Sequence, residues 1–169
     1  MSDIVWPDGF VPGFTDNFCS NEEIVRGLSV AQLWPWLNEP GRWPTYYENA
    51  SNVRFAEGGG PALVLGARFA FETFGLVATC RCVEHVPPVP GQPARLAWHG
   101  FAGDGEGRLD AHHAWLLEDL SEGRVRILTQ ETQNGAPARQ LAATRPNPML
   151  EGHQAWLDGL LAAARGLRA

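Results

Sequence analysis

The final third of the 169-residue chain places two long alternating segments before one long amphipathic segment. Residues 109–120 and 124–134 alternate apolar and polar positions, as the strands of a half-buried sheet do. The turn at residues 121–123 joins them as a hairpin. Asn147 and Pro148 then supply a good N-cap and a good first helical residue. This order predicts a curved antiparallel sheet wrapped around one C-terminal helix.

The helix prediction rests on apolar residues that recur at spacings of three and four. Glu151, Gln154 and Asp158 mark the opposite, solvent-facing side, and Gly166 suits a left-handed stop. The residues of the buried stripe are Met149, Leu150, His153, Trp156, Leu157, Leu160, Leu161 and Ala164.

The front of the chain divides into an extension and the start of a domain. Residues 1–16 are rich in Pro, Gly and aromatic residues and predict an irregular N-terminal extension. Its Trp6, Phe10 and Phe14 are expected to pack against the domain, because a free tail would be more polar. A single domain is predicted over residues 17–169, starting with a strand.

Short elements fill the middle of the chain. Ser29 and Gln32 form a capping box, and Pro35 interrupts the helix that begins there. Residues 31–47 therefore predict two short helices with a bend. Alternation predicts four further strands, for about seven in total, around residues 52–55, 68–73, 76–85 and 95–99.

Composition excludes several classes of function. The net charge is −6, and all 13 basic residues are Arg, so a Schiff-base lysine and a phosphate-loop lysine are excluded. The acidic balance argues against nucleic acid and anionic lipid surfaces as partners. No apolar run approaches the ~20 residues that cross a membrane. An odd cysteine count without a basic, apolar leader predicts a cytoplasmic protein.

Three pairs of segments have the pattern of a known family: residues 28–37 and 43–47 (the helix pair), 84–88 and 95–98 (the central hairpin), and 113–118 and 128–131 (the last two strands). In these segments the chain resembles the START-like (SRPBCC) superfamily, which includes birch-pollen-allergen-like proteins and polyketide cyclases. The resemblance implies an α+β helix-grip fold with a cavity between sheet and C-terminal helix that holds an apolar or aromatic ligand. It implies no catalytic residue, since the superfamily has no shared catalytic signature.

Alternation then suggests which side chains face the helix. Glu131 and His113 are predicted to lie on the inner face of the sheet, with Arg126 and His112 on the outer face. Aromatic residues would line the pocket, with the helix pair at its mouth. The predicted ligand-binding residues are Phe69, Phe71, Trp98, His113, Trp115, Thr129, Glu131, His153 and Trp156.

Several interpretations stay open at this point. The leading hypothesis is binding of a small hydrophobic, lipid- or polyketide-like molecule, with no cofactor and no metal. The second is a cyclase, dehydratase or hydrolase that uses His113 or Glu131, although the two could equally form a structural contact. The third is a protein-interaction module like the chaperone-ATPase activators, which needs an exposed patch at Trp34-Pro35 and Trp43-Pro44. Cys80 and Cys82 are interpreted as core residues, and no oligomeric state is predicted.

Overall fold

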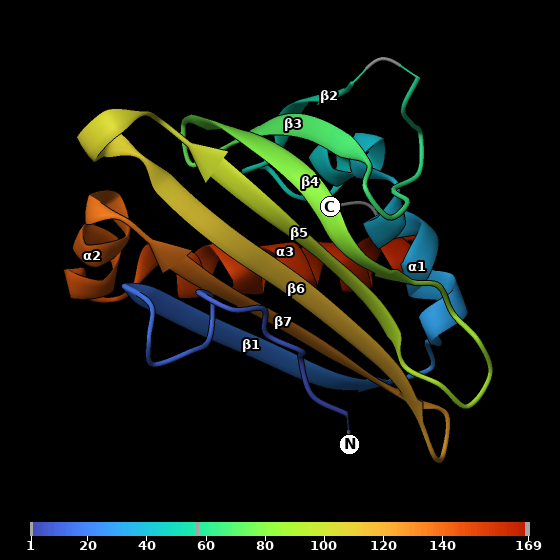
Figure 1. Ribbon diagram of the computed structural model, residues 1–169. Helices are drawn as coiled ribbons and strands as arrows, with labels where there is room; N and C mark the ends of the chain where they lie inside the picture. The colour runs from blue at the N-terminus through green and yellow to red at the C-terminus, as the bar shows by residue number, and fades with distance from the viewer. Residues whose placement is uncertain (1, 57, 168–169) are drawn as a thin grey trace.

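The computed structural model describes residues 2–56 and 58–167, so the outermost residues of the predicted domain ranges, 1 and 168–169, lie outside it. A seven-stranded antiparallel sheet, in the order β1-β7-β6-β5-β4-β3-β2, curves over helix α3 (Figure 1). The predicted α+β helix-grip fold is confirmed. The elements are β1 (Asn17–Arg26), α1 (Val30–Asn38), η1 (Pro40–Thr45), β2 (Ser51–Phe55), β3 (Arg68–Thr73), β4 (Leu76–Val86), β5 (Ala94–Ala102), η2 (Gly105–Gly107), β6 (Leu109–Leu120), β7 (Arg124–Asn134), α2 (Ala136–Ala143) and α3 (Pro148–Ala164).

The pairing of β6 with β7 sets which side chains face α3. His113 lies opposite Glu131, and Trp115 lies opposite Thr129. Trp115 and Ile127 belong to the main core, which also contains residues of α3. The predicted inward register of these two strands is confirmed.

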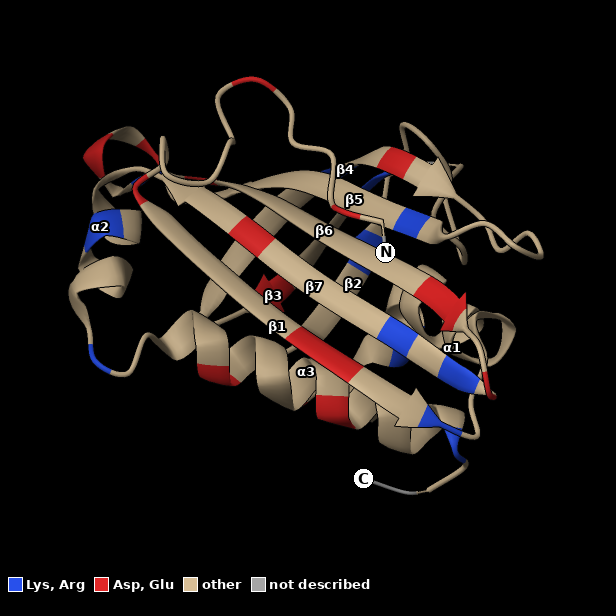
Figure 2. Cartoon of the chain, turned by 90° about the horizontal axis from the view of Figure 1, so that it is seen from below, with Lys and Arg blue, Asp and Glu red and all other residues tan. Residues whose placement is uncertain are grey.

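Helix α3 begins and ends as its residues predict. The side chain of Asn147 accepts a hydrogen bond from the backbone N–H of Met149 at 3.0 Å, and Pro148 is the first helical residue. Gly159 lets the helix approach the chain closely, since a Cβ there would lie 2.0 Å from the carbonyl oxygen of Tyr46. Acidic residues lie along β1 and on α3 (Figure 2). No described helix combines the length and apolar character needed to cross a membrane.

The two short helices after β1 are also confirmed. The Oε1 atom of Gln32 accepts from the backbone N–H of Ser29 at 2.9 Å, and α1 continues through Pro35 before the chain bends into η1. The indoles of Trp34 and Trp43 are 8% and 0% exposed. These two side chains therefore offer no exposed patch for the protein-interaction alternative.

Helix α2 was not predicted, since the sequence pattern indicates no element between residues 134 and 147. Gly135 adopts φ +119°, and Pro137 lies in the first turn of the helix. Asp16 holds this turn in place, because its Oδ2 atom accepts from the N–H of Gly135 at 2.8 Å and from Arg139 at 2.9 Å. Only Ala138 is buried in α2, so eight residues show too little of an apolar stripe to predict a helix.

The N-terminal segment of residues 2–16 contains no helix or strand and lies across the convex face of the sheet (Figure 1). Arg126 on the outer face of β7 donates to the carbonyl oxygen of Ser2 at 2.6 Å. Ile4 closes a second small core with four residues of the sheet: Ala97, Ala114, Leu116 and Leu128. The segment thus shields the outer face of β5, β6 and β7 from water.

Two of the three aromatic residues predicted to pack do so. The rings of Trp6 and Phe10 lie 5.5 Å and 5.9 Å from the ring of His112, centroid to centroid. Phe14 is 87% exposed, so its predicted packing is wrong. A turn closed by the Phe14 N–H and the Val11 carbonyl carries the ring away from the sheet.

Candidate functional site

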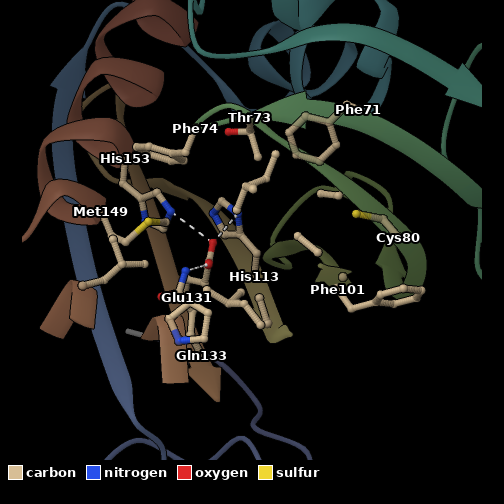
Figure 3. A pocket seen from close by; sticks show the side chains of 18 of the residues that line it. Phe71, Thr73, Phe74, Cys80, Phe101, His113, Glu131, Gln133, Met149 and His153 are labelled. Atoms are coloured by element: carbon tan, nitrogen blue, oxygen red, sulfur yellow. Dashed lines mark hydrogen bonds and ion pairs between the residues drawn. The ribbon is translucent and has the colours of Figure 1, made fainter. Parts of the chain in front are cut away.

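A cavity of ≈ 390 Å³ lies between the sheet and the N-terminal half of α3 (Figure 3). Its volume falls within the range of small-molecule pockets, roughly 300–1,000 Å³. Side chains of β3, β4, β5, β6, β7, α2 and α3 line it. Phe74, Leu76 and Phe101 are exposed lining residues, so the rim is apolar.

The cavity occupies one end of the space beneath the sheet, because large side chains fill the other end. Trp43 and Trp115 are fully buried there. The ring of Trp43 lies 5.3 Å from that of Trp98 and 4.9 Å from that of Trp156. The sequence predicts the mouth of the cavity at the helix pair, but this prediction is wrong, since only Tyr47 of that region lines the cavity. Helix α2 and the β3–β4 turn border it instead.

Glu131 points from β7 into the inner end of the cavity (Figure 3). Its Oε2 atom lies 3.2 Å from His113 Nδ1 and 3.2 Å from His153 Nε2. Its Oε1 atom accepts from the side-chain amide of Gln133. Two N–H donors, from His153 and Gln133, therefore converge on a carboxylate that is 7% exposed, and His113 Nδ1 lies in close contact with it.

A chain of amides fixes the direction of the Gln133 donor. The Met149 N–H at the start of α3 can only donate, so it orients the oxygen of Asn147 toward itself. The Asn147 amide N–H then donates to Asn17 at 2.8 Å, and the Asn17 amide donates to Gln133 at 2.8 Å. Gln133 must therefore turn its own N–H toward Glu131. The N-terminus of α3, the positive end of its dipole, is linked by this relay to the carboxylate.

The outer nitrogen atoms of the two histidines have partners as well. His113 Nε2 lies 2.8 Å from the hydroxyl oxygen of Thr129, and His153 Nδ1 lies 3.3 Å from the sulfur of Cys19. Burial lowers the pKa of His113 well below its usual value, so its ring is neutral at pH 7. Burial raises the pKa of Cys19, and the Glu131 charge adds to this, so Cys19 remains a thiol. The Cys19 thiol can therefore donate to His153 Nδ1.

His113, His153 and Glu131 also have the residue types of a zinc ligand set, and their candidate ligand atoms lie within 4.8 Å of one another. A histidine lone pair lies in the plane of its ring. The two imidazoles are stacked, with 9° between their planes and 4.4 Å between their centroids, so one ion cannot lie in both planes. A metal would require one ring to turn and leave Thr129 or Cys19. The observed arrangement instead suits a hydrogen-bonded carboxylate.

The nine residues predicted to bind ligand fall into two groups. Three of them do not line the cavity but pack behind residues that do. Phe69 stacks on Phe71, whereas Trp115 and Thr129 contact His113. The six that line the cavity are Phe71, Trp98, His113, Glu131, His153 and Trp156. Contact of any of the nine with a ligand stays a prediction.

Neither the amide relay nor the contribution of α2 to the cavity lining was predicted from the sequence. A signal for the relay was present, since Gln133 shares a strand face with Glu131 and lies opposite Asn17 on β1. Cys80, interpreted as a core residue, is buried and also lines the cavity. Burial raises its pKa, so it is a neutral thiol there.

Comparisons with solved structures place the chain among known proteins. It is similar to the 1.88 Å crystal structure of hypothetical protein jhp0584 from Helicobacter pylori, with 44% identity over 97% of both chains and a TM-score of 0.92. The di-domain ARO/CYC BexL from the BE-7585A biosynthetic pathway is also similar in fold (13% identity, 85% of this chain, 45% of BexL, TM-score 0.59). The chain belongs to the same family as jhp0584, and its fold is that of START-like proteins.

Another START-like similarity is to CalU16 from Micromonospora echinospora, with 14% identity over 90% of this chain and 76% of CalU16 and a TM-score of 0.56. At this identity, as for BexL, the likeness concerns the fold alone. A scan of protein-family models and a search of curated proteins give no match. The START-like site therefore has to be interpreted from its own residues.

Proposed function

We propose that this START-like protein binds a small, largely apolar or aromatic molecule, lipid- or polyketide-like in character, between the sheet and α3. The observation that carries the proposal is an apolar cavity of ≈ 390 Å³ with one buried carboxylate at its inner end. Phe71, Met149 and Trp156 supply apolar contact area, and Glu131 orients a polar group. A cytoplasmic location and the lack of a nucleic-acid partner remain predictions from composition.

Filling the cavity tests this proposal. Ala78 on β4 lines the cavity, whereas Ala70 on β3 lies opposite Thr79 on the outer face. We expect Ala78→Phe to remove most of the small molecule that travels with the protein when it is purified from its own host, because the added ring occupies the ligand's space. Native mass spectrometry gives the bound fraction.

Ala70→Phe is the matched control, since it adds the same ring outside the cavity and should leave the bound fraction unchanged. Circular dichroism shows whether both variants fold. Full occupancy in a folded Ala78→Phe protein, or no adduct in the wild-type protein, would count against the proposal.

Proton-transfer catalysis in the same cavity is the second candidate, and the pairing of Glu131 with His113 favours it. The Glu131 carboxylate lies 3.2 Å from the neutral imidazole of His113 and can accept a proton from a bound molecule. Incubating the recovered ligand with fresh protein separates the two functions. With the incubation carried out in D2O, an unchanged ligand mass and chromatographic retention support binding alone, and deuterium uptake or a changed retention supports catalysis.

A further inference from the structure

We infer that the ligand of this cavity presents a hydrogen-bond donor, best a protonated amine, to Glu131, and that molecules ending in an acid group are rejected. The inference rests on the proposed function and names the chemical class that the same site accepts. It follows from the charges and hydrogen-bonding valences around the inner end of the cavity.

The charges of the residues that line the cavity favour a cationic ligand. The chain has no lysine, and no arginine is among the described residues that line the cavity. Burial raises the pKa of Tyr47 to about 12 and also raises that of Cys80, so both are neutral at pH 7. His113 is neutral because burial lowers its pKa. No described arginine can therefore form an ion pair with an acidic ligand inside the cavity, whereas the Glu131 carboxylate can form an ion pair with a cationic ligand.

The hydrogen-bonding capacity of the Glu131 carboxylate favours a ligand that donates a hydrogen bond. A carboxylate has about four lone-pair sites, and two N–H groups, from His153 and Gln133, donate to Glu131. Acceptor sites on the carboxylate are therefore left for a ligand. The outer nitrogens of His113 and His153 face Thr129 and Cys19. The Gln133 amide has a second N–H, so the inner end offers the Glu131 carboxylate as an acceptor and one neutral donor.

The remaining polar groups do not change this preference. The hydroxyl groups of Thr73 and Tyr47 also line the cavity, and a hydroxyl can donate or accept. Gln140 on α2 is exposed and lies at the rim. These groups accommodate donors and acceptors alike, so discrimination depends on Glu131.

Three probes with the same alkyl chain test the inference: 1-octylamine, 1-octanol and octanoate. Each is titrated into the protein at pH 7 by calorimetry, with intrinsic tryptophan fluorescence, to which Trp98 and Trp156 in the cavity wall contribute, as a second readout. We expect the amine to bind most tightly, the alcohol next, and octanoate about 100-fold more weakly than the amine. Like charges in a poorly solvated site repel strongly, which is the reason for the last difference.

Glu131→Gln removes the charge and keeps the shape, so it should erase most of the discrimination between amine and octanoate. Glu122→Gln, in the exposed β6–β7 turn, changes the net charge equally and should leave the discrimination intact. Octanoate binding as tightly as the amine to wild-type protein would overturn the inference and leave the proposed function standing. Failure of all three probes to bind would overturn both.

Discussion

Replacing Gly159 by alanine is expected to lower the free energy of unfolding by about 3 kcal/mol, the upper end of the cost of overpacking. The added Cβ would lie 2.0 Å from the carbonyl oxygen of Tyr46 and 3.1 Å from its ring. The carbonyl belongs to the backbone, so it cannot rotate away as a flexible side chain would. The helix must move, although alanine favours helix by about 1 kcal/mol over glycine. Urea denaturation followed by circular dichroism measures the change.

Gly41→Ala is the control for this substitution. Gly41 lies in η1, has no heavy atom within 4 Å of the added Cβ, and does not need a left-handed backbone. Its stability should stay within about 0.5 kcal/mol of the wild-type value. If Gly159→Ala were equally harmless, α3 would not press against Tyr46, and the described placement of the helix under the sheet would be wrong.

Acidification is expected to destabilise the protein through His112, by about 2 kcal/mol between pH 7 and pH 4.5. His112 is 2% exposed beneath the N-terminal segment, and neither ring nitrogen has a hydrogen-bond partner among the described residues. Burial, together with the nearby His99, lowers its pKa to about 4. The unfolded chain, with a histidine pKa of about 6.5, takes up the proton first. Stability therefore falls as the pH drops from about 6.5 to 4 and then levels.

The His112→Leu variant isolates this effect from the titration of carboxylates, which both proteins share. Its stability should fall by about 2 kcal/mol less than that of the wild-type protein over the same pH interval. Urea denaturation at both pH values provides the comparison. Equal losses in the two proteins would show that His112 takes up no proton in this range, and that its burial under Trp6 and Phe10 is not as described.

The sequence predicted the fold well because local patterns determine each element. The alternation around His113 and Glu131 requires a long hairpin, and Asn147-Pro148 requires a helix start. The inward register follows from the same alternation. Helix α2 was missed because it is short and mostly exposed, although Gly135 followed by Pro137 is a helix-start signal that could have found it.

The site was only partly predictable, because its geometry depends on how α3 is rotated and on side-chain volumes. Alternation places Glu131 on the inner face, but it cannot show that His153 meets the same oxygen as His113. Nor does it distinguish the end of the sheet that Trp43 and Trp115 fill from the end left hollow. These features emerge only when the helix and sheet are packed together.

A crystal structure of the protein grown with 1-octylamine would test the central claim most directly. The alkyl chain should lie in the ≈ 390 Å³ cavity between the sheet and α3, with its nitrogen roughly 3 Å from a Glu131 carboxylate oxygen. An amine found only on the outer surface, with the cavity closed by its own side chains, would contradict the account.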